Sequence, residues 1–375
     1  MSGKIIASPP KNYVSGKYAV GTKCFSVVDT DRNEILGDGR GKRKIAVRMY
    51  YPADKSSVEG KKRAVIFSEA KKAAILKAFR LRSLSDDMCY ADYYENVPFA
   101  ENQKFPLIMF SMGYNSYVES NTYLLCALAS HGYIVASVGH AYEAVENDYD
   151  DGSTDLYDKK INKMMYTSMI GAVFSQRKIQ KKNLNYQEAL EQFEAFQKKY
   201  TPYIKDRVIE WKEDIEKAFE AVKQRYSDSI DFSHGTGVSG HSLGGCLAYY
   251  LCRYSDKFSC GINMDGGLFG EYPEKTMEKP FCQISCKENV NLETRPFVNT
   301  NADTYQVVFE DMKHMGFTDA KFYITIKVLS GKIDSEEMFE HLVYCHLTFF
   351  DRYLKGRDVK FSGMPSDKIK YRKIF

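Results

Sequence analysis

The sequence lacks any long apolar run, which argues against a membrane-spanning protein and against a chain with a signal peptide. No segment approaches the ~18 uncharged apolar residues that a membrane-spanning helix needs. The opening MSGKIIASPPKNYVSGKYAVG holds no apolar stretch of signal-peptide length, so we expect no signal peptide. The chain also lacks a strong charge, because its formal net charge is only +4 over 375 residues. We therefore expect no nucleic-acid binding and, at most, a transient contact with an anionic membrane surface.

The cysteines show no disulfide pattern. There are nine, an odd number at scattered positions, and several, such as Cys260 and Cys282, lie inside apolar stretches. A disulfide framework would show an even number at regular spacings. We therefore expect buried thiols in a reduced, cytoplasmic protein.

Patterns for metal and cofactor binding are also missing. His341 and His346 are five residues apart and do not share a helix face, and no matching pair of histidines accompanies Cys282 and Cys286. The glycine-rich GHSLGG lacks the lysine of a phosphate loop and the G-x-G-x-x-G spacing of a dinucleotide site. We expect neither a metal ion nor an organic cofactor.

Short apolar runs bounded by turn residues are plentiful, and they are typical of strands. They lie at 44–53, 105–111, 132–140, 235–242, 260–265, 281–286 and 305–311. Helical patterns lie at 117–132, at 244–256 and at 335–356, the last with Gly356 as its stop signal. Strands that alternate with helices predict a doubly wound, mostly parallel α/β sheet. In such sheets the active site lies outside the carboxyl ends of the strands.

The alternation breaks between about 150 and 228, where the pattern is helical and we expect no strand. Thr201-Pro202 is typical of an N-cap followed by proline at the first helical position. We interpret 150–201 as a helical cap inserted between two parts of the sheet domain, 1–149 and 202–375. The alternative is a separate helical subdomain with no role in the active site.

A second insertion, at 62–87, is basic and partly amphipathic. One interpretation is a helix that contacts a lipid surface. The other, which we favour, is a helix packed on the body of the protein with its Lys and Arg side chains in water.

Ser242 lies between glycines in GVSGHSLGGCLAYYL. A strand-like segment precedes it and an apolar, helix-like segment follows, which is the context of a nucleophile elbow. A Cβ at Gly240 or Gly244 would clash in so sharp a turn, and the N–H groups of a helix N-terminus favour negative charge. A small residue in a glycine-rich turn is the alternative. We predict that Ser242 is a nucleophile and that His241 only fills the position before it.

A serine nucleophile needs a base. Three histidines follow Ser242 in the chain. His341 and His346 lie within the last predicted helix, where we expect surface or packing roles. His314 follows the last predicted strand in a loop with Gly316, so we predict that it is the base.

The base in turn needs an orienting carboxylate, and two candidates lie at strand ends. Asp265 ends one strand, directly before Gly266-Gly267, and Glu288 ends the next. The residues alone favour Asp265 only narrowly. Either acid could instead cap a neighbouring helix.

The oxyanion hole needs two backbone N–H groups. We expect one from Leu243, directly after the nucleophile. The other should come from Tyr114, in the loop after the second strand, where Gly113 lets the backbone approach.

With these segments in place, the chain resembles the plasma and type II platelet-activating-factor acetylhydrolases, a branch of the α/β-hydrolases, from roughly Val20 to Tyr353. The similarity rests on VRMYYPA, on FPLIMFSMGYNSYVESNTYLLCALASHGYIVASVGH, and on GHSLGG, GINMDGG and KHMGFTD. The resemblance implies an α/β-hydrolase fold and an acid on the strand after the elbow helix, which favours Asp265 over Glu288. Two features depart from the family: Met112 replaces a usual histidine, and the cap is long.

We predict a serine-dependent carboxylic ester hydrolase that uses Ser242, His314 and Asp265. Met164, Met165 and Phe174 in the cap suggest an acyl or aromatic substrate, for example a short-chain or oxidised phospholipid ester, although we favour ordinary helix packing for them. The same three residues would equally serve an amidase, a peptidase or an acyltransferase. A non-catalytic binding protein on the same fold is a further alternative.

Overall fold

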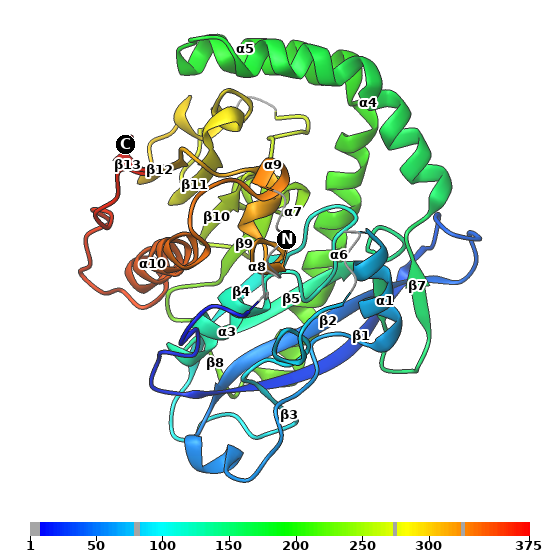
Figure 1. Cartoon of the computed structure of the whole chain (residues 1–375), viewed down its shortest axis with the longest axis vertical. Coiled ribbons are helices and arrows are strands. Elements are labelled where there is room, and N and C mark those ends of the chain that lie inside the picture. Colours follow the sequence, from blue (N-terminus) through cyan, green and yellow to red (C-terminus); the bar gives the residue numbers. More distant parts are fainter. Residues whose placement is uncertain (1–7, 79–82, 273–275, 324–326) are drawn as a thin grey trace, which may run out of the picture.

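A computed structural model of the chain describes residues 8–78, 83–272, 276–323 and 327–375 (Figure 1). Within these ranges the side chains of residues 78, 86, 162 and 165–171 are not described.

One mixed sheet forms the centre of the molecule. Its 11 strands are β1 (Ala19–Asn33), β2 (Lys42–Ala53), β3 (Tyr94–Glu95), β4 (Phe105–Ser111), β5 (Ile134–His140), β8 (Ile230–Asp231), β9 (Gly237–His241), β10 (Cys260–Met264), β11 (Phe281–Cys286), β12 (Thr304–Phe309) and β13 (Ile369–Lys373). The order is β13-β12-β11-β10-β9-β4-β5-β2-β1-β3, with β8 paired to β4. The run from β12 to β5 is parallel, which confirms the predicted doubly wound, mostly parallel sheet.

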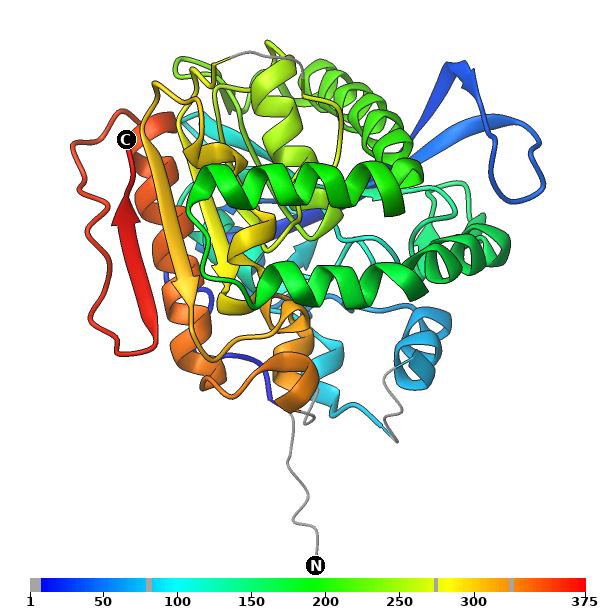
Figure 2. The ribbon, with the colours of Figure 1, turned by 90° about the horizontal axis from the view of Figure 1, so that it is seen from above.

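Each strand predicted from an apolar run is present, with its ends shifted by no more than about two residues. The strands that the sequence did not predict lie at or next to an edge of the sheet or are very short. The long β1–β2 hairpin projects from the sheet (Figure 2), and the end of β1 carries polar residues that hide its apolar pattern. The expectation of no strand after residue 150 is wrong for β7 (Thr154–Leu156), which pairs with β6 (Glu146–Asp148). Strands of three mostly polar residues give no apolar signal.

Helices cover both faces of the sheet. They are α1 (Glu69–Ala78), α2 (Asp86–Cys89), α3 (Thr122–Ser130), α4 (Lys159–Gln180), α5 (Tyr186–Tyr200), α6 (Pro202–Tyr226), α7 (Leu243–Tyr254), α8 (Ala320–Tyr323), α9 (Lys327–Ser330) and α10 (Ser335–Leu354), with 3-10 turns η1 (Lys55–Val58), η2 (Lys287–Leu292), η3 (Arg295–Phe297) and η4 (His314–Phe317). Apolar side chains of α3 and α10 pack on one face of the sheet, and those of α6 and α7 on the other. Gly356, in the left-handed region at φ +62°, follows α10 as its predicted stop signal.

The segment expected to be the cap consists mainly of α4 and α5, which lie side by side (Figure 2). The end of α4 contacts η2, directly after β11: Gln180 donates to the Asn289 side chain at 2.8 Å, and Asn291 donates to the Ile179 carbonyl at 2.8 Å. These helices therefore lie over the carboxyl end of β11. The next helix, α6, buries Trp211 and its apolar neighbours against the sheet.

The 62–87 insertion forms α1 and α2, apart from residues 79–82, which lie outside the described residues. Ile75 is fully buried, so the expected packing on the body is confirmed. The expectation that the basic side chains are in water is wrong for Lys71, which is 1% exposed. Its ammonium donates to both carboxylate oxygens of Glu119, at 3.0 and 3.1 Å, and to Asp148 at 2.8 Å. The sequence hides this contact because both acids lie far away along the chain.

Lys71→Ala should lower the free energy of unfolding by about 1–3 kcal/mol, because the buried Glu119 carboxylate loses both hydrogen bonds from Lys71, although it keeps its ion pair with Arg48 at 3.3 Å. Burial alone would lower the pKa of Lys71, but Glu119 and Asp148 raise it above its ordinary value, so the lost group is charged. Urea unfolding measures the change. Lys77→Ala, on the exposed side of the same helix, is the control and should change the free energy by less than ~0.5 kcal/mol. Equal losses in the two variants would contradict the ion-pair account.

Candidate active site

Ser242 lies in a strained turn between β9 and α7. Its backbone adopts φ +57° and ψ −122°, a conformation that non-glycine residues rarely adopt. A Cβ on Gly240 would lie 2.4 Å from the carbonyl carbon of Gly244, and one on Gly244 would lie 2.1 Å from the carbonyl oxygen of Ser111. The expected clash is therefore confirmed, and the turn has the form of a nucleophile elbow.

The predicted nucleophile, base and orienting acid lie together. The Ser242 hydroxyl is 2.8 Å from His314 Nε2, and His314 Nδ1 is 2.7 Å from Asp265 Oδ2. Asp265 directly follows β10 and His314 opens η4, so both side chains lie at the carboxyl ends of parallel strands. Glu288, the competing acid, is paired with Lys313 instead.

Both oxygens of the buried Asp265 carboxylate accept hydrogen bonds. Oδ1 accepts from the Cys286 backbone N–H at 2.7 Å, and Oδ2 accepts from Asn289 Nδ2 at 2.8 Å as well as from His314. Burial alone would raise the pKa of Asp265, but His314 and the Cys286 N–H hold it below its ordinary value. The group is therefore ionised at neutral pH. Sequence reasoning missed Cys286 and Asn289, since nothing in SCKENVN marks them as neighbours of Asp265.

His241 supports the backbone of the predicted base. Its Nε2 donates to the His314 carbonyl at 3.0 Å, and the two imidazole rings lie 4.7 Å apart. Burial, together with the neighbouring His314, lowers the pKa of His241 to about 3. His241 is thus neutral and directed at the backbone of the base, which agrees with the expectation that it is not the base itself.

The loop predicted to supply part of an oxyanion hole crosses directly over the serine. A Cβ on Gly113 would lie 3.1 Å from the Ser242 Cβ, so the backbone at this position passes very close to the nucleophile. Tyr114 follows in the same loop, and Leu243 is the first residue of α7. Both predicted donors therefore adjoin Ser242, and their role stays a prediction.

The remaining histidines of α10 are buried packing residues. His346 Nε2 is 3.1 Å from the Ser239 hydroxyl, and His341 Nδ1 is 2.6 Å from the Tyr371 hydroxyl.

In the part of the chain that the structure describes, no group of three or more His, Cys, Asp and Glu side chains could hold a metal ion. Over the same residues, no helix combines the length and the apolar character needed to cross a membrane. All nine cysteines are free, and only Cys24 is exposed.

A cavity of about 640 Å³ lies beside the predicted base, between η2, the loop after β12 and α9. Lys313, the neighbour of His314, lines it, whereas Ser242 does not. The wall is rich in lysine: Lys182, Lys287, Lys313, Lys327 and Lys332, with Glu288, Glu310 and Asp311 between them.

Met164 and Phe174 of the cap do not fill the protein interior. Met164 is 45% and Phe174 69% exposed, so the favoured explanation of ordinary helix packing is wrong for these two residues. The side chain of Met165 lies outside the described residues.

Among known proteins, the chain is similar to platelet-activating factor acetylhydrolases of vertebrates. The enzyme of Cavia porcellus is 25% identical over 291 residues, which cover 72% of this chain and 62% of that protein. The enzyme of Canis lupus familiaris is 24% identical over 283 residues, covering 69% and 59%. The chain thus spans about three fifths of the length of these curated relatives.

A solved structure, the ferulic acid esterase from Streptomyces cinnamoneus, shares the fold. It superposes with a TM-score of 0.72 at 21% identity and covers 98% of this chain and 99% of its own. This likeness, together with the parallel sheet and the elbow, shows the α/β-hydrolase fold that the sequence predicted. The family described as platelet-activating factor acetylhydrolase, isoform II, matches residues 8–365, and the chain therefore belongs to this family.

Proposed function

We propose that the protein is a serine hydrolase of carboxylic esters. The continuous hydrogen-bond chain from Ser242 through His314 to Asp265, built on a strained elbow, is the observation that carries the proposal. The family relationship supports the same chemistry. A binding protein that had lost catalysis would not need to keep all three side chains within hydrogen-bond distance of one another.

In this mechanism Ser242 Oγ attacks the ester carbonyl while its proton passes to His314 Nε2. Asp265 accepts the Nδ1–H hydrogen bond and stabilises the imidazolium that forms. The N–H groups of Leu243 and Tyr114 would hold the oxyanion. The intermediate then expels the alcohol, which takes the proton from His314, and leaves an acyl group on Ser242. Water, activated by His314, releases the acid in the second half-reaction.

A short-chain ester of a phospholipid is the substrate that we propose. The relatives carry the name platelet-activating factor acetylhydrolase. The cavity beside His314 supports the proposal because its five lysines outnumber its three acids, and a wall with a net positive charge can attract a phosphate. Since Ser242 does not line this cavity, the cavity would take the leaving group of the substrate rather than its acyl chain.

The protein should also touch lipid surfaces transiently. Val328 and Leu329 on α9 are 79% and 46% exposed, and Val328 and Lys327 belong to the wall of the cavity. Apolar side chains beside lysines suit the boundary of an anionic membrane. For its location we propose the cytoplasm, because eight buried free thiols suit a reducing compartment.

Ser242→Ala and His314→Ala should each reduce kcat for p-nitrophenyl acetate by about 10⁴- to 10⁶-fold, because neither half of the acyl transfer can then proceed. Asp265→Asn should cost about 10⁴-fold by favouring the wrong imidazole tautomer. Glu288→Gln is the matched carboxylate control and should change kcat little. A Glu288 variant as inactive as the Asp265 variant would overturn the choice of acid.

The acyl-chain preference can be measured with p-nitrophenyl esters from acetyl to palmitoyl and with the matching anilides. We expect kcat/KM to be highest for the shortest acyl chains and the anilides to react far more slowly. A maximum at long chains would keep the serine chemistry but replace the substrate class with long-chain lipids. Faster anilide cleavage would favour an amidase, and no turnover of either series would favour a binding protein.

Val328→Ser combined with Leu329→Ser should reduce cosedimentation with phosphatidylserine vesicles, because the change removes the most exposed apolar residue of the cavity rim. Ile35→Ser is the control, since Ile35 is 64% exposed but lies on the β1–β2 turn, outside the cavity wall. Equal binding by the double variant and the parent would contradict the lipid contact, as would an equal loss in the Ile35 variant.

A further inference from the structure

A second buried Asp–His–Ser chain lies behind the loop that crosses Ser242. Asp214 Oδ2 is 2.9 Å from His140 Nδ1, and His140 Nε2 is 3.0 Å from the Ser111 hydroxyl. All three residues are fully buried, so none of them can meet substrate. They come from three elements: Ser111 ends β4, His140 ends β5 and Asp214 lies on α6.

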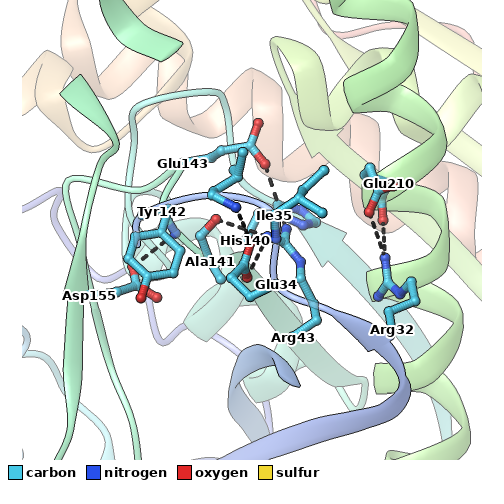
Figure 3. A network of polar contacts seen from close by, with 12 residues as sticks. Arg32, Glu34, Ile35, Arg43, His140, Ala141, Tyr142, Glu143, Asp155 and Glu210 are labelled. Carbon is cyan, nitrogen blue, oxygen red and sulfur yellow. Dashed lines mark hydrogen bonds and ion pairs between the residues drawn. The ribbon is translucent and has the colours of Figure 1, made fainter. Parts of the chain in front are cut away.

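The acid of this chain, Asp214, lies in a buried charge network, and Figure 3 shows Arg32, Arg43 and His140 from it. Arg43 contacts Asp214 at 2.7 Å, and Arg32 contacts it at 2.5 Å. Arg32 also bonds the Glu210 carboxylate at 3.1 Å, as Figure 3 shows. Arg32 on β1 and Arg43 on β2 therefore connect these two strands to helix α6 through the Asp214 carboxylate.

One face of α6 contacts the segment that follows β5. Arg207 donates to Glu143 at 2.8 and 2.5 Å, and Trp211 donates to the same carboxylate at 2.8 Å. The Trp211 ring also stacks on the His140 ring, with centroids 3.7 Å apart and planes 8° apart. Residues 207, 211 and 214 recur at helical spacing, so all three contacts arise from a single helix face.

The protonation states fix the direction of every hydrogen bond in the chain. Burial alone would raise the pKa of Asp214, but Arg43 and His140 hold it well below its ordinary value, while burial lowers the pKa of His140. A neutral His140 then donates from Nδ1 to the Asp214 carboxylate and accepts at Nε2 from the Ser111 hydroxyl. The Ser111 side chain is thereby held in one orientation.

The segment after β5 also holds the far end of the loop that crosses Ser242. The Asn115 N–H donates to the Glu143 carbonyl at 2.8 Å, and the Val145 N–H donates to the Ser116 carbonyl at 2.7 Å. At the near end, the Ser111 carbonyl packs against the elbow, 2.1 Å from where a Cβ on Gly244 would lie. Backbone contacts on both sides, at Ser111 and at Asn115 and Ser116, therefore hold residues 112–114 in place.

We infer that Ser111, His140 and Asp214 are positioning residues, which hold the 112–114 loop at the distance from Ser242 that oxyanion binding requires. The inference rests on the proposed function. Replacing a buried ion pair by apolar residues often costs no stability. We therefore attribute to this network the fixed geometry of the loop rather than a gain in stability. Because α6 follows the cap directly in the chain, the same network connects the cap to the oxyanion loop.

Ser111→Ala tests the inference, since it removes a single oxygen atom. We expect kcat for p-nitrophenyl acetate to fall about 10- to 100-fold, because a misplaced donor weakens transition-state binding, with little change in KM. A trifluoromethyl ketone adds to the serine and places an oxyanion in the hole, so its affinity should fall by the same factor as kcat/KM. A non-reactive alcohol inhibitor should bind as before.

Ser239→Ala is the matched control. Ser239 lies on β9, the neighbour of β4, and its buried hydroxyl also contacts a histidine, but that histidine, His346, belongs to α10 and not to the network around Asp214. We expect a comparable decrease in Tm in both variants and a decrease in kcat only in Ser111→Ala. Unchanged kcat and ketone affinity in Ser111→Ala, or equal losses in Ser239→Ala, would overturn the inference.

The proposed function can fail separately from this inference. If the parent protein turned over no ester, the proposed function would be wrong, while the ketone affinities of the parent and Ser111→Ala would still decide whether the loop is positioned by Ser111. Should Ser111→Ala not fold, Ser111→Cys, which keeps a weaker donor, is measured in the same way and should show an intermediate loss.

Discussion

The close approach of three backbone segments around Ser242 is the constraint on which the rest of the site depends. The end of β4 lies where β-carbons at positions 240 and 244 would be, so only glycine is accepted at either position. This contact places the 112–114 loop over Ser242 and directs the N-terminus of α7 towards it. Because the elbow exists, the end of β10 and the loop after β12 can deliver an acid and a base to the same point.

The sheet order explains why Asp265 and not Glu288 completes the chain. Strand β10 is the direct neighbour of β9, and Met264 pairs with His241, so Asp265 emerges next to Ser242. Glu288 follows β11, one strand further away, and contacts Lys313. Sequence alone could not separate the two acids decisively, since both end an apolar run. The order of strands in a sheet is a tertiary property.

Features with a local signal could be predicted from the sequence, and those that depend on distant partners could not. The central strands and the elbow follow from apolar runs and glycine positions within a few residues. By contrast, Lys71 gave no sign of burial, because its partner Glu119 lies 48 residues away. Asn289 and His140 were missed for the same reason: each acts through a contact with a residue that lies far away in the sequence.

The most direct test of the central claim is labelling with a fluorophosphonate, followed by mass spectrometry of the peptides. The account predicts a single adduct, on Ser242, that forms quickly in the parent protein and much more slowly in His314→Gln, because the hydroxyl then lacks its base. Labelling of a different serine, or labelling of Ser242 at the same rate in both proteins, would contradict the proposal that His314 and Asp265 activate this residue.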